Sequence, residues 1–156
     1  MHLHKYEKIW LMLGGATIVI FLSIIGFTAF AMDHIPPSDL TIIDPELVDQ
    51  TPPFNEPGLK QIGDNEYQLT MVAEAFTFRP SEVEIPKGSK VHFVVTSKDV
   101  VHGFALAGTN VNMMIVPGHI NSYTQVFTKT GDYLLLCNEY CGIGHQLMGT
   151  KIKVVE

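Results

Sequence analysis

The densest group of metal-ligating side chains in this sequence lies between residues 137 and 148. The segment reads C-N-E-Y-C-G-I-G-H-Q-L-M and contains two thiols, one imidazole and one thioether, at Cys137, Cys141, His145 and Met148. These soft and borderline ligands favour copper or zinc over magnesium or calcium. Glycines within and just after the segment allow the backbone to fold tightly around an ion. The spacing therefore predicts a metal site built largely from one loop.

A second imidazole has to come from another part of the chain to complete such a site. The best candidate is His102 in the sequence D-V-V-H-G-F, where Asp99 supplies a nearby carboxylate. A carboxylate can orient a ligating imidazole by accepting a hydrogen bond from its second ring nitrogen. We therefore expect His102 to be a ligand and Asp99 to support it.

The number of thiols decides which copper chemistry is expected. A single blue copper needs one cysteine, two histidines and a weak methionine ligand, and this sequence supplies that set plus a second cysteine. Two thiolates can bridge two copper ions, each of which takes one histidine and one weak axial donor. Met148 supplies one such donor, and a backbone carbonyl near Glu139 supplies the other. No position is left for a substrate, so the expected chemistry is electron relay.

Two simpler interpretations of the same residues remain open at this point. Cys137 and Cys141 are candidates for a disulfide, because the compartment outside a membrane is oxidising. The other interpretation is a zinc site with two cysteines and two histidines, although zinc has no use for a methionine ligand. The presence of His145 and Met148 beside the thiols favours copper over both.

The part of the chain that holds these residues is predicted to be all-β. Short apolar runs separated by turn signals such as P-K-G, P-G and T-G-D favour a sandwich or barrel. No stretch between them has a helical period long enough for a crossover helix. The expected form is a Greek-key β-sandwich over residues 61–156. The expected strands are 66–73, 81–86, 90–97, 101–107, 111–116, 120–128, 131–137 and 149–155.

An uncharged apolar stretch covers residues 9–32. About 20 apolar residues suffice for a helix to cross a membrane, so this stretch predicts a transmembrane helix. A signal peptide is the alternative, because A-F-A at residues 29–31 resembles a cleavage site, but the apolar region of a signal peptide is usually about 7–15 residues long. Lys5 and Lys8 in the preceding tail, residues 1–8, predict a cytoplasmic N-terminus and an external β domain.

Residues 33–60 contain six of the nine prolines, and six acidic residues against Lys60 alone. Proline fixes φ and removes backbone donors, so we expect a stiff, extended stalk between the helix and the β domain. The formal net charge of the whole chain is −6, which argues against a nucleic-acid partner. A hydrophobic fraction of 46% excludes an intrinsically disordered chain.

The loop motif resembles that of subunit II of haem–copper cytochrome c oxidases, which holds a dinuclear copper centre called copper A. The family motif C-x-E-x-C-x-x-x-H-x-x-M and an upstream D-V-x-H are both complete in this sequence. The resemblance implies a cupredoxin-like Greek-key sandwich that binds two copper ions. It also implies bridging thiolates at Cys137 and Cys141, terminal imidazoles at His102 and His145, an axial thioether at Met148 and a carbonyl ligand at Glu139.

The number of predicted transmembrane helices differs from that of most family members and indicates a subfamily. Most members carry two transmembrane helices before the copper domain, whereas this sequence has one, like the B-type or ba-type oxidases. In that subfamily a glutamate near the start of the helix lies at the mouth of a proton channel, which makes Glu7 a candidate for the channel entrance. Phe76 and Phe78 match family aromatics near the copper site. Trp10 is the only tryptophan, so electron transfer through a surface indole is not expected.

The resemblance implies a role in respiration. The copper domain is expected to accept electrons from cytochrome c on the outer face of a bacterial cell membrane and to pass them to haem in subunit I. That subunit holds the haems, reduces oxygen to water and moves protons, and a small third subunit is a further expected partner. The near-neutral β domain predicts that cytochrome c docks on an apolar patch around the copper loop.

Functions of other classes remain as alternatives. A membrane-anchored copper carrier would use the same ligand types but would hold one labile ion. Nitrous-oxide reductase has a similar copper domain, fused there to a large catalytic domain that is missing here, and a nitric-oxide reductase of the same superfamily could use a similar subunit. A subunit of a quinol oxidase would lack the copper ligands. The number of copper ions bound per chain distinguishes the carrier from the oxidase subunit.

Overall fold

The computed structural model describes residues 4–32 and 41–156. The chain divides into two compact units, residues 1–36 and residues 37–156. Residues 1–3 of the expected cytoplasmic tail and residues 33–40 of the expected stalk lie outside the described residues.

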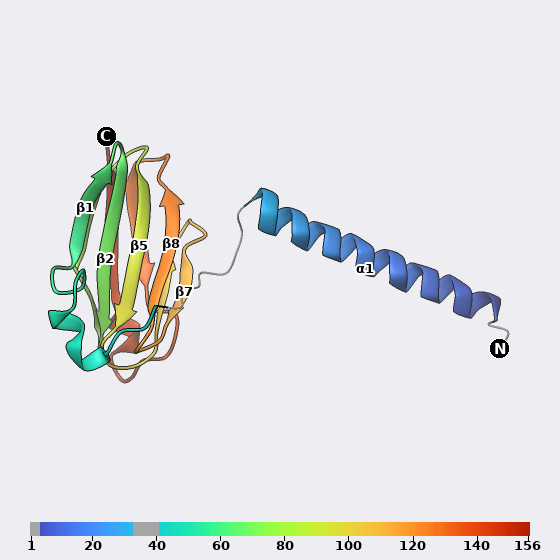
Figure 1. The fold of residues 1–156 in the computed structure, drawn as a ribbon, viewed down its shortest axis with the longest axis horizontal. Helices are drawn as coiled ribbons and strands as arrows, with labels where there is room; N and C mark the ends of the chain where they lie inside the picture. The colour runs from blue at the N-terminus through green and yellow to red at the C-terminus, as the bar shows by residue number, and fades with distance from the viewer. Residues whose placement is uncertain (1–3, 33–40) are drawn as a thin grey trace. The chain divides into compact units, whose positions relative to one another are not determined.

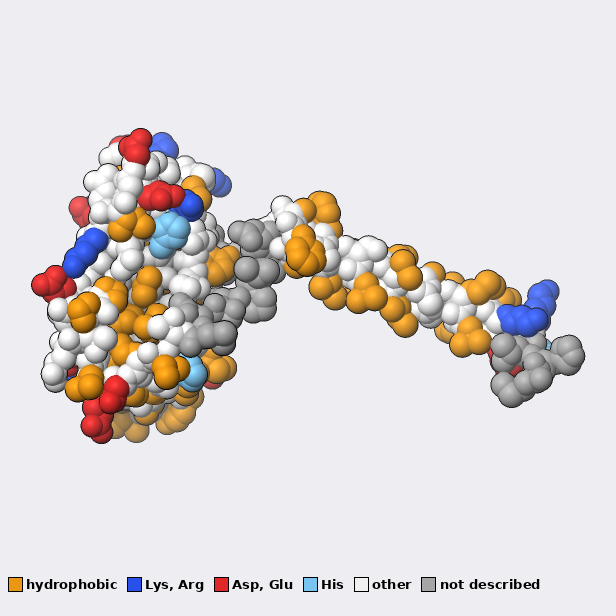
Figure 2. All heavy atoms as spheres, viewed as in Figure 1, with side chains coloured by type: hydrophobic (Ala, Val, Ile, Leu, Met, Phe, Trp, Pro, Cys, Tyr) orange, Lys and Arg blue, Asp and Glu red, His pale blue; other side chains and the backbone are white. Residues whose placement is uncertain are grey.

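The first unit contains helix α1, Lys5–Ala31 (Figure 1). Hydrophobic side chains cover α1 along its length (Figure 2), and none of its residues is buried within the protein. A helix of 27 residues is about 40 Å long, which exceeds the ~30 Å hydrocarbon core of a bilayer. The structure therefore has an N-terminal apolar helix that could cross a membrane, as predicted. It begins four residues earlier than the expected stretch 9–32.

The second unit is a β-sandwich of two five-stranded sheets. The first sheet has the order β1-β2-β5-β8 (Figure 1), with β3 paired to β2. The second has the order β4-β10-β9-β6-β7. The pairs β2–β5 and β4–β10 are parallel, and the others are antiparallel. The strands are β1 (Gly58–Gly63), β2 (Glu66–Glu74), β3 (Thr77–Arg79), β4 (Glu82–Pro86), β5 (Lys90–Ser97), β6 (His102–Leu106), β7 (Asn112–Ile115), β8 (Ile120–Val126), β9 (Gly131–Leu136) and β10 (Gly149–Val155).

All eight expected strands are present, and their ends differ from the expected ones by at most two residues. The all-β sandwich with one N-terminal helix is therefore confirmed. Strands β1 and β3 were not expected. No side chain of β1 is buried, so this strand lacks the alternation of a half-buried strand, and β3 has only three residues. Neither strand therefore produces a clear sequence pattern.

The core between the sheets is built on aromatic side chains. Phe93 on β5 meets Phe104 on β6 edge to face, with ring centroids 5.7 Å apart, and Phe104 meets Phe78 on β3 in the same way at 5.6 Å. This geometry is the favoured one for aromatic pairs. The same core also contains three of the expected metal ligands, Cys137, Cys141 and Met148. The ligand loop is thus packed as part of the sandwich.

The expected extended stalk is wrong for the described residues 41–60. Residues Pro45–Gln50 form a 3₁₀ helix, η1, and Gly58 starts β1. Pro45 occupies the first helical turn, where proline is tolerated, and Asp44 caps the helix by accepting a hydrogen bond from the backbone N of Glu46 (3.0 Å). Apolar side chains within this segment pack on Val72 of β2 to form a second small core: Ile43, Val48 and Phe54. The segment therefore belongs to the β domain.

Candidate metal centre

The expected ligand loop connects β9 to β10, two neighbouring antiparallel strands. Leu136 at the end of β9 faces Gly149 at the start of β10 in the strand register. The backbone N of Cys137 donates to the O of Met148 over 3.1 Å, so the two ends of the loop meet. Within the loop, His145–Leu147 form a short 3₁₀ helix, η2. The sheet therefore holds the loop at both ends, as the sequence predicted.

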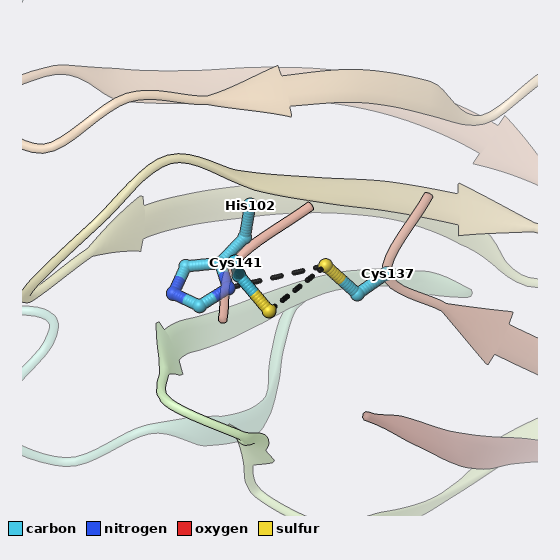
Figure 3. A group of neighbouring side chains, drawn as sticks. All are labelled: His102, Cys137 and Cys141. Carbon is cyan, nitrogen blue, oxygen red and sulfur yellow. Dashed lines mark hydrogen bonds between the residues drawn. The ribbon is translucent and has the colours of Figure 1, made fainter. Parts of the chain in front are cut away.

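The two thiols lie side by side but are not bonded to each other. Their Sγ atoms are 3.8 Å apart, and both cysteines are free (Figure 3). A disulfide would require an S–S distance of about 2.05 Å. Two donors bound at about 2.3 Å to one ion in tetrahedral geometry are themselves about 3.8 Å apart. The separation of the two sulfurs therefore fits thiolates that share a metal ion.

His102 reaches the thiols from the start of β6. Its side chain is fully buried, and its Nδ1 atom is 3.9 Å from the Sγ of Cys137 (Figure 3). One ligand atom from each of His102, Cys137 and Cys141 lies within 4.8 Å of the others. The structure thus brings together ligands that are 35 residues apart in the sequence.

The remaining expected ligands lie on the other flanks of the thiols. The Nδ1 of His145 and the Sδ of Met148 are each 3.6 Å from the Sγ of Cys141. The backbone O of Glu139 is 3.1 Å from the Sγ of Cys137. The other four predicted ligand groups therefore lie around the pair of cysteine sulfurs. Two thiols, two imidazole nitrogens, a thioether and a carbonyl form a donor set that suits copper.

The sulfur-containing side chains of the centre are buried, and this burial affects the protonation of the Cys141 thiol. Cys137, Cys141 and Met148 are each less than a tenth exposed. Burial and the neighbouring Cys137 thiol raise the pKa of the Cys141 thiol to about 11. Without a metal the Cys141 thiol therefore keeps its proton at neutral pH. A metal ion that binds there has to displace that proton.

The carboxylate of Asp99 lies against the imidazole of His102. Its Oδ1 is 2.8 Å from the Nε2 of His102, and its carboxylate accepts backbone hydrogen bonds from Ala75 (2.6 Å) and Val100 (2.7 Å). Burial alone would raise the pKa of Asp99, but these hydrogen bonds, led by that from His102, hold it below its ordinary value. An ionised Asp99 accepts a hydrogen bond from the Nε2–H group of His102, which leaves the Nδ1 atom without a proton and facing the thiols.

Two close approaches hold the loop against the rest of the sandwich. A Cβ atom on Gly103 would lie 1.9 Å from the Oδ1 of Asn138, so only glycine lets the loop lie over β6. The ring of Phe76 covers Gly142 and Gly144, and a Cβ on Gly144 would lie 2.5 Å from the ring. Sequence reasoning missed the role of Gly103, for which the H-G pair beginning β6 was the available signal.

The other expected site residues are placed as follows. Phe76 packs on the ligand loop, whereas Phe78 is buried in the main core against Phe104. Glu7 lies in α1, where its side chain accepts a hydrogen bond from the backbone N of His4 (2.8 Å) and so caps the helix. The two phenylalanines therefore have different surroundings, although they are only two residues apart.

The ligand loop itself exposes three large apolar side chains to solvent. Tyr140, Ile143 and Leu147 are 77%, 88% and 78% exposed. The ring of Tyr140 meets the ring of the half-buried His145 edge to face, with centroids 5.8 Å apart. We call these three exposed residues the apolar rim. Exposed apolar groups of this size next to a buried site are typical of an interaction surface.

Comparison with known proteins decides the family. The sequence profile described as cytochrome C oxidase subunit II, periplasmic domain, matches residues 66–155. The chain belongs to the cytochrome c oxidase subunit II family. A cytochrome c oxidase subunit 2 from Thermus thermophilus is 37% identical over 155 residues, covering 97% of this chain and 92% of that protein. Another subunit 2 from Thermus thermophilus is 40% identical over 124 residues, covering 78% of this chain and 92% of that protein.

Solved structures agree with this assignment. A chain of a heme–copper terminal oxidase dimer superposes with a TM-score of 0.84 at 34% identity, covering 97% of this chain and all of that chain. The periplasmic domain of subunit II of cytochrome oxidase from Bradyrhizobium japonicum gives a TM-score of 0.54 at 24% identity, covering 57% and 83% of the two chains, and shows the fold alone. The chain is thus subunit II of a haem–copper oxidase, with a copper-binding, cupredoxin-like domain, and it works with other subunits.

Proposed function

We propose that this subunit II accepts electrons from cytochrome c at a dinuclear copper centre and passes them to haem in subunit I, for oxygen reduction coupled to proton translocation. One observation carries the proposal: two unbonded cysteine sulfurs 3.8 Å apart, each with an imidazole Nδ1 within 3.9 Å. A site for one copper needs only one thiolate. The second thiolate and the second weak donor are what a second ion requires.

The residues would divide the work as the family motif assigns it. Cys137 and Cys141 would hold both ions, His102 and His145 would bind one each, and Met148 and the carbonyl of Glu139 would be the weak ligands. When bound, two bridged copper ions supply a one-electron carrier whose charge change is shared between both metals. The chain keeps this site rigid and dry, because the sulfurs belong to the packed core. No ligand position is left open, so the bond chemistry belongs to subunit I.

The apolar rim supports docking of the electron donor next to the site. His145 is the half-buried ligand under this rim, so an electron would have a short path from the surface to the centre. The rim carries no charged side chain among Tyr140, Ile143 and Leu147. Turnover with cytochrome c should therefore depend only modestly on ionic strength.

The membrane arrangement is part of the same proposal. α1 spans a bacterial cell membrane once, with Lys5 and Lys8 on the cytoplasmic side and the copper domain on the outer face. Among the described residues one helix is long and apolar enough to span a membrane, which supports the B-type subfamily, with subunit I and a small third subunit as partners. In that arrangement Glu7 would lie at the entrance of a proton channel. Its hydrogen bond to His4 gives it a capping role as well, so a Glu7→Gln variant should keep the helix while lowering proton uptake.

The decisive experiment measures copper content and the electron paramagnetic resonance spectrum of the full-length chain in detergent. The proposal predicts two copper ions per chain and an unpaired electron delocalised over both nuclei. Cys137→Ser should abolish that spectrum, and Met148→Leu should change it. Met114→Leu is the matched control, because Met114 is an exposed methionine on β7 that is not an expected ligand. A single exchangeable ion in the unaltered chain would instead identify a copper carrier.

A further inference from the structure

Asp49 pairs with residues at the ends of two strands, β3 and β5. Its Oδ1 is 2.6 Å from the Nη2 of Arg79, and its Oδ2 accepts a hydrogen bond from the Nζ of Lys98. These partners are 30 and 49 residues away in the sequence. Arg79 ends β3 and Lys98 follows the end of β5. One carboxylate on η1 therefore ties both segments to residues 41–57.

Asp49 is itself held in place by apolar packing. Val48, directly before it, is fully buried in the small core with Ile43, Phe54 and Val72. An ordinary surface ion pair is weak because ordering two long side chains costs entropy. Here the backbone of the carboxylate is already fixed, and two cations converge on it. The network is therefore better ordered than an isolated surface pair.

Both partners of Asp49 lead directly to groups that position the expected ligands. Lys98 precedes Asp99, whose carboxylate orients His102 over 2.8 Å. The backbone N of Lys98 also donates to the O of Ala73 (3.0 Å), which fixes this turn against the end of β2. A displacement of Lys98 would therefore move the carboxylate on which the His102 ring depends.

The second path runs through Arg79. The same guanidinium pairs with Glu74 at 3.0 Å, so Asp49 and Glu74 together fix the short turn between β2 and β3. That turn contains Ala75, which donates its backbone N–H to Asp99 (2.6 Å), and Phe76, whose ring covers the glycines of the ligand loop. The two paths meet at Asp99.

We propose that Asp49 is a positioning residue for the copper site. It holds the segments that carry Asp99 and Phe76, and through them it sets the orientation of His102 and the packing of the ligand loop. The inference rests on the proposed function, because it takes this loop to be the copper site. Residues 41–57 would thus influence the metal centre through Asp49 and its two partners.

Asp49→Asn tests this, because it removes the charge and keeps the size of the side chain. The full-length chain in detergent is loaded with copper, and the rate of copper release to a chelator and the visible and paramagnetic resonance spectra are recorded. We expect release to be about threefold to tenfold faster, with a changed spectrum. Asp49→Glu should retain most of the original behaviour. Lys98→Gln removes one of the two ion pairs of Asp49 and should have a smaller effect on copper release. This variant replaces Asp49→Asn in the test if Asp49→Asn does not fold.

Glu84→Gln is the matched control, because Glu84 pairs with Lys153 at 3.0 Å on the other sheet. It should leave the release rate and spectra unchanged. The proposal is overturned if Asp49→Asn lowers only the thermal stability, or if Glu84→Gln has the same effect on release. Failure of the proposed function would be a separate result, in which the unaltered chain binds one copper ion. The rates of copper release from the unaltered chain and from Asp49→Asn would still test the role of Asp49.

Discussion

Gly103 lies so close beneath Asn138 that a methyl group at Gly103 would come within 1.9 Å of the Asn138 Oδ1 atom. The backbone N of Gly103 also donates to the Sγ of Cys137 over 3.4 Å. The first residues of the ligand loop are therefore seated directly on β6. This contact links the strand that carries His102 to the loop that carries the thiols.

Gly103→Ala should displace the loop from β6 and weaken copper binding. Overpacking of this kind costs about 1–3 kcal/mol, and here the displaced atoms include backbone next to Cys137. Copper content and the free energy of unfolding should both fall. Gly108→Ala is the control, because Gly108 has a φ of +80° but no atom near the added methyl group. It should reduce stability and leave copper binding intact; an equal loss of copper in both variants would contradict the explanation.

Asp99→Asn should lower copper affinity about tenfold, because groups that support a metal-bound imidazole typically contribute 10–100-fold. The amide keeps the shape of the side chain, but its oxygen is a weaker acceptor for the hydrogen bond from the Nε2–H group of His102. Competition with a copper chelator gives the affinity. Asp132→Asn, whose carboxylate pairs with Lys151 at 3.7 Å on the surface, is the control. An unchanged affinity in Asp99→Asn would show that His102 is oriented by packing alone.

Ile143→Lys should slow electron transfer from cytochrome c without changing the copper spectrum. Ile143 belongs to the apolar rim and is 88% exposed, so a lysine there fits the free chain but places a charge in the docked complex. We expect KM for cytochrome c to rise about tenfold, as for an interface residue worth about 1.4 kcal/mol. Ile62→Lys changes an exposed isoleucine on β1 and should have no effect. Equal effects of both variants would argue against docking at the rim.

The contribution of Asp49 to stability should depend on pH. Hydrogen bonds from Lys98 and then Arg79 hold the pKa of Asp49 below its ordinary value. The ionised carboxylate therefore stabilises the fold above the unfolded-state pKa of about 3.9, and this contribution is lost as the pH falls through the lower folded-state pKa. Thermal unfolding of the unaltered chain and of Asp49→Asn should differ at neutral pH and converge in acid. High salt should reduce the difference, because the groups are partly exposed. A difference that persisted in strong acid would mean that charge is not responsible.

The ligand set and most of the sheet structure could be predicted from the sequence because both are local patterns. Cys137, Cys141, His145 and Met148 lie in one loop, and strands such as β5 show regular alternation. His102 needed only its D-V-x-H context. These signals do not depend on how distant segments pack.

The features that were missed depend on long-range packing. The proline content predicted an extended stalk, but Val48 and Phe54 pack on Val72 of β2. The sequence pattern of a strand does not reveal which segment will cover such an apolar side chain. The pairs made by Asp49 join residues 30 and 49 positions apart. No local spacing predicts such contacts.

The meeting of the loop ends, where Cys137 donates to Met148 and Leu136 faces Gly149, has a consequence for how such sites can change. A segment that leaves and re-enters two paired strands at one point can be exchanged without a change in the strand register, provided that the new loop still fits against Gly103 and Phe76. Five of the six donor groups would travel with that exchange, and only the imidazole on β6 would stay behind. Most of the donor set is therefore carried by one replaceable segment, whereas its position depends on the strands beneath it.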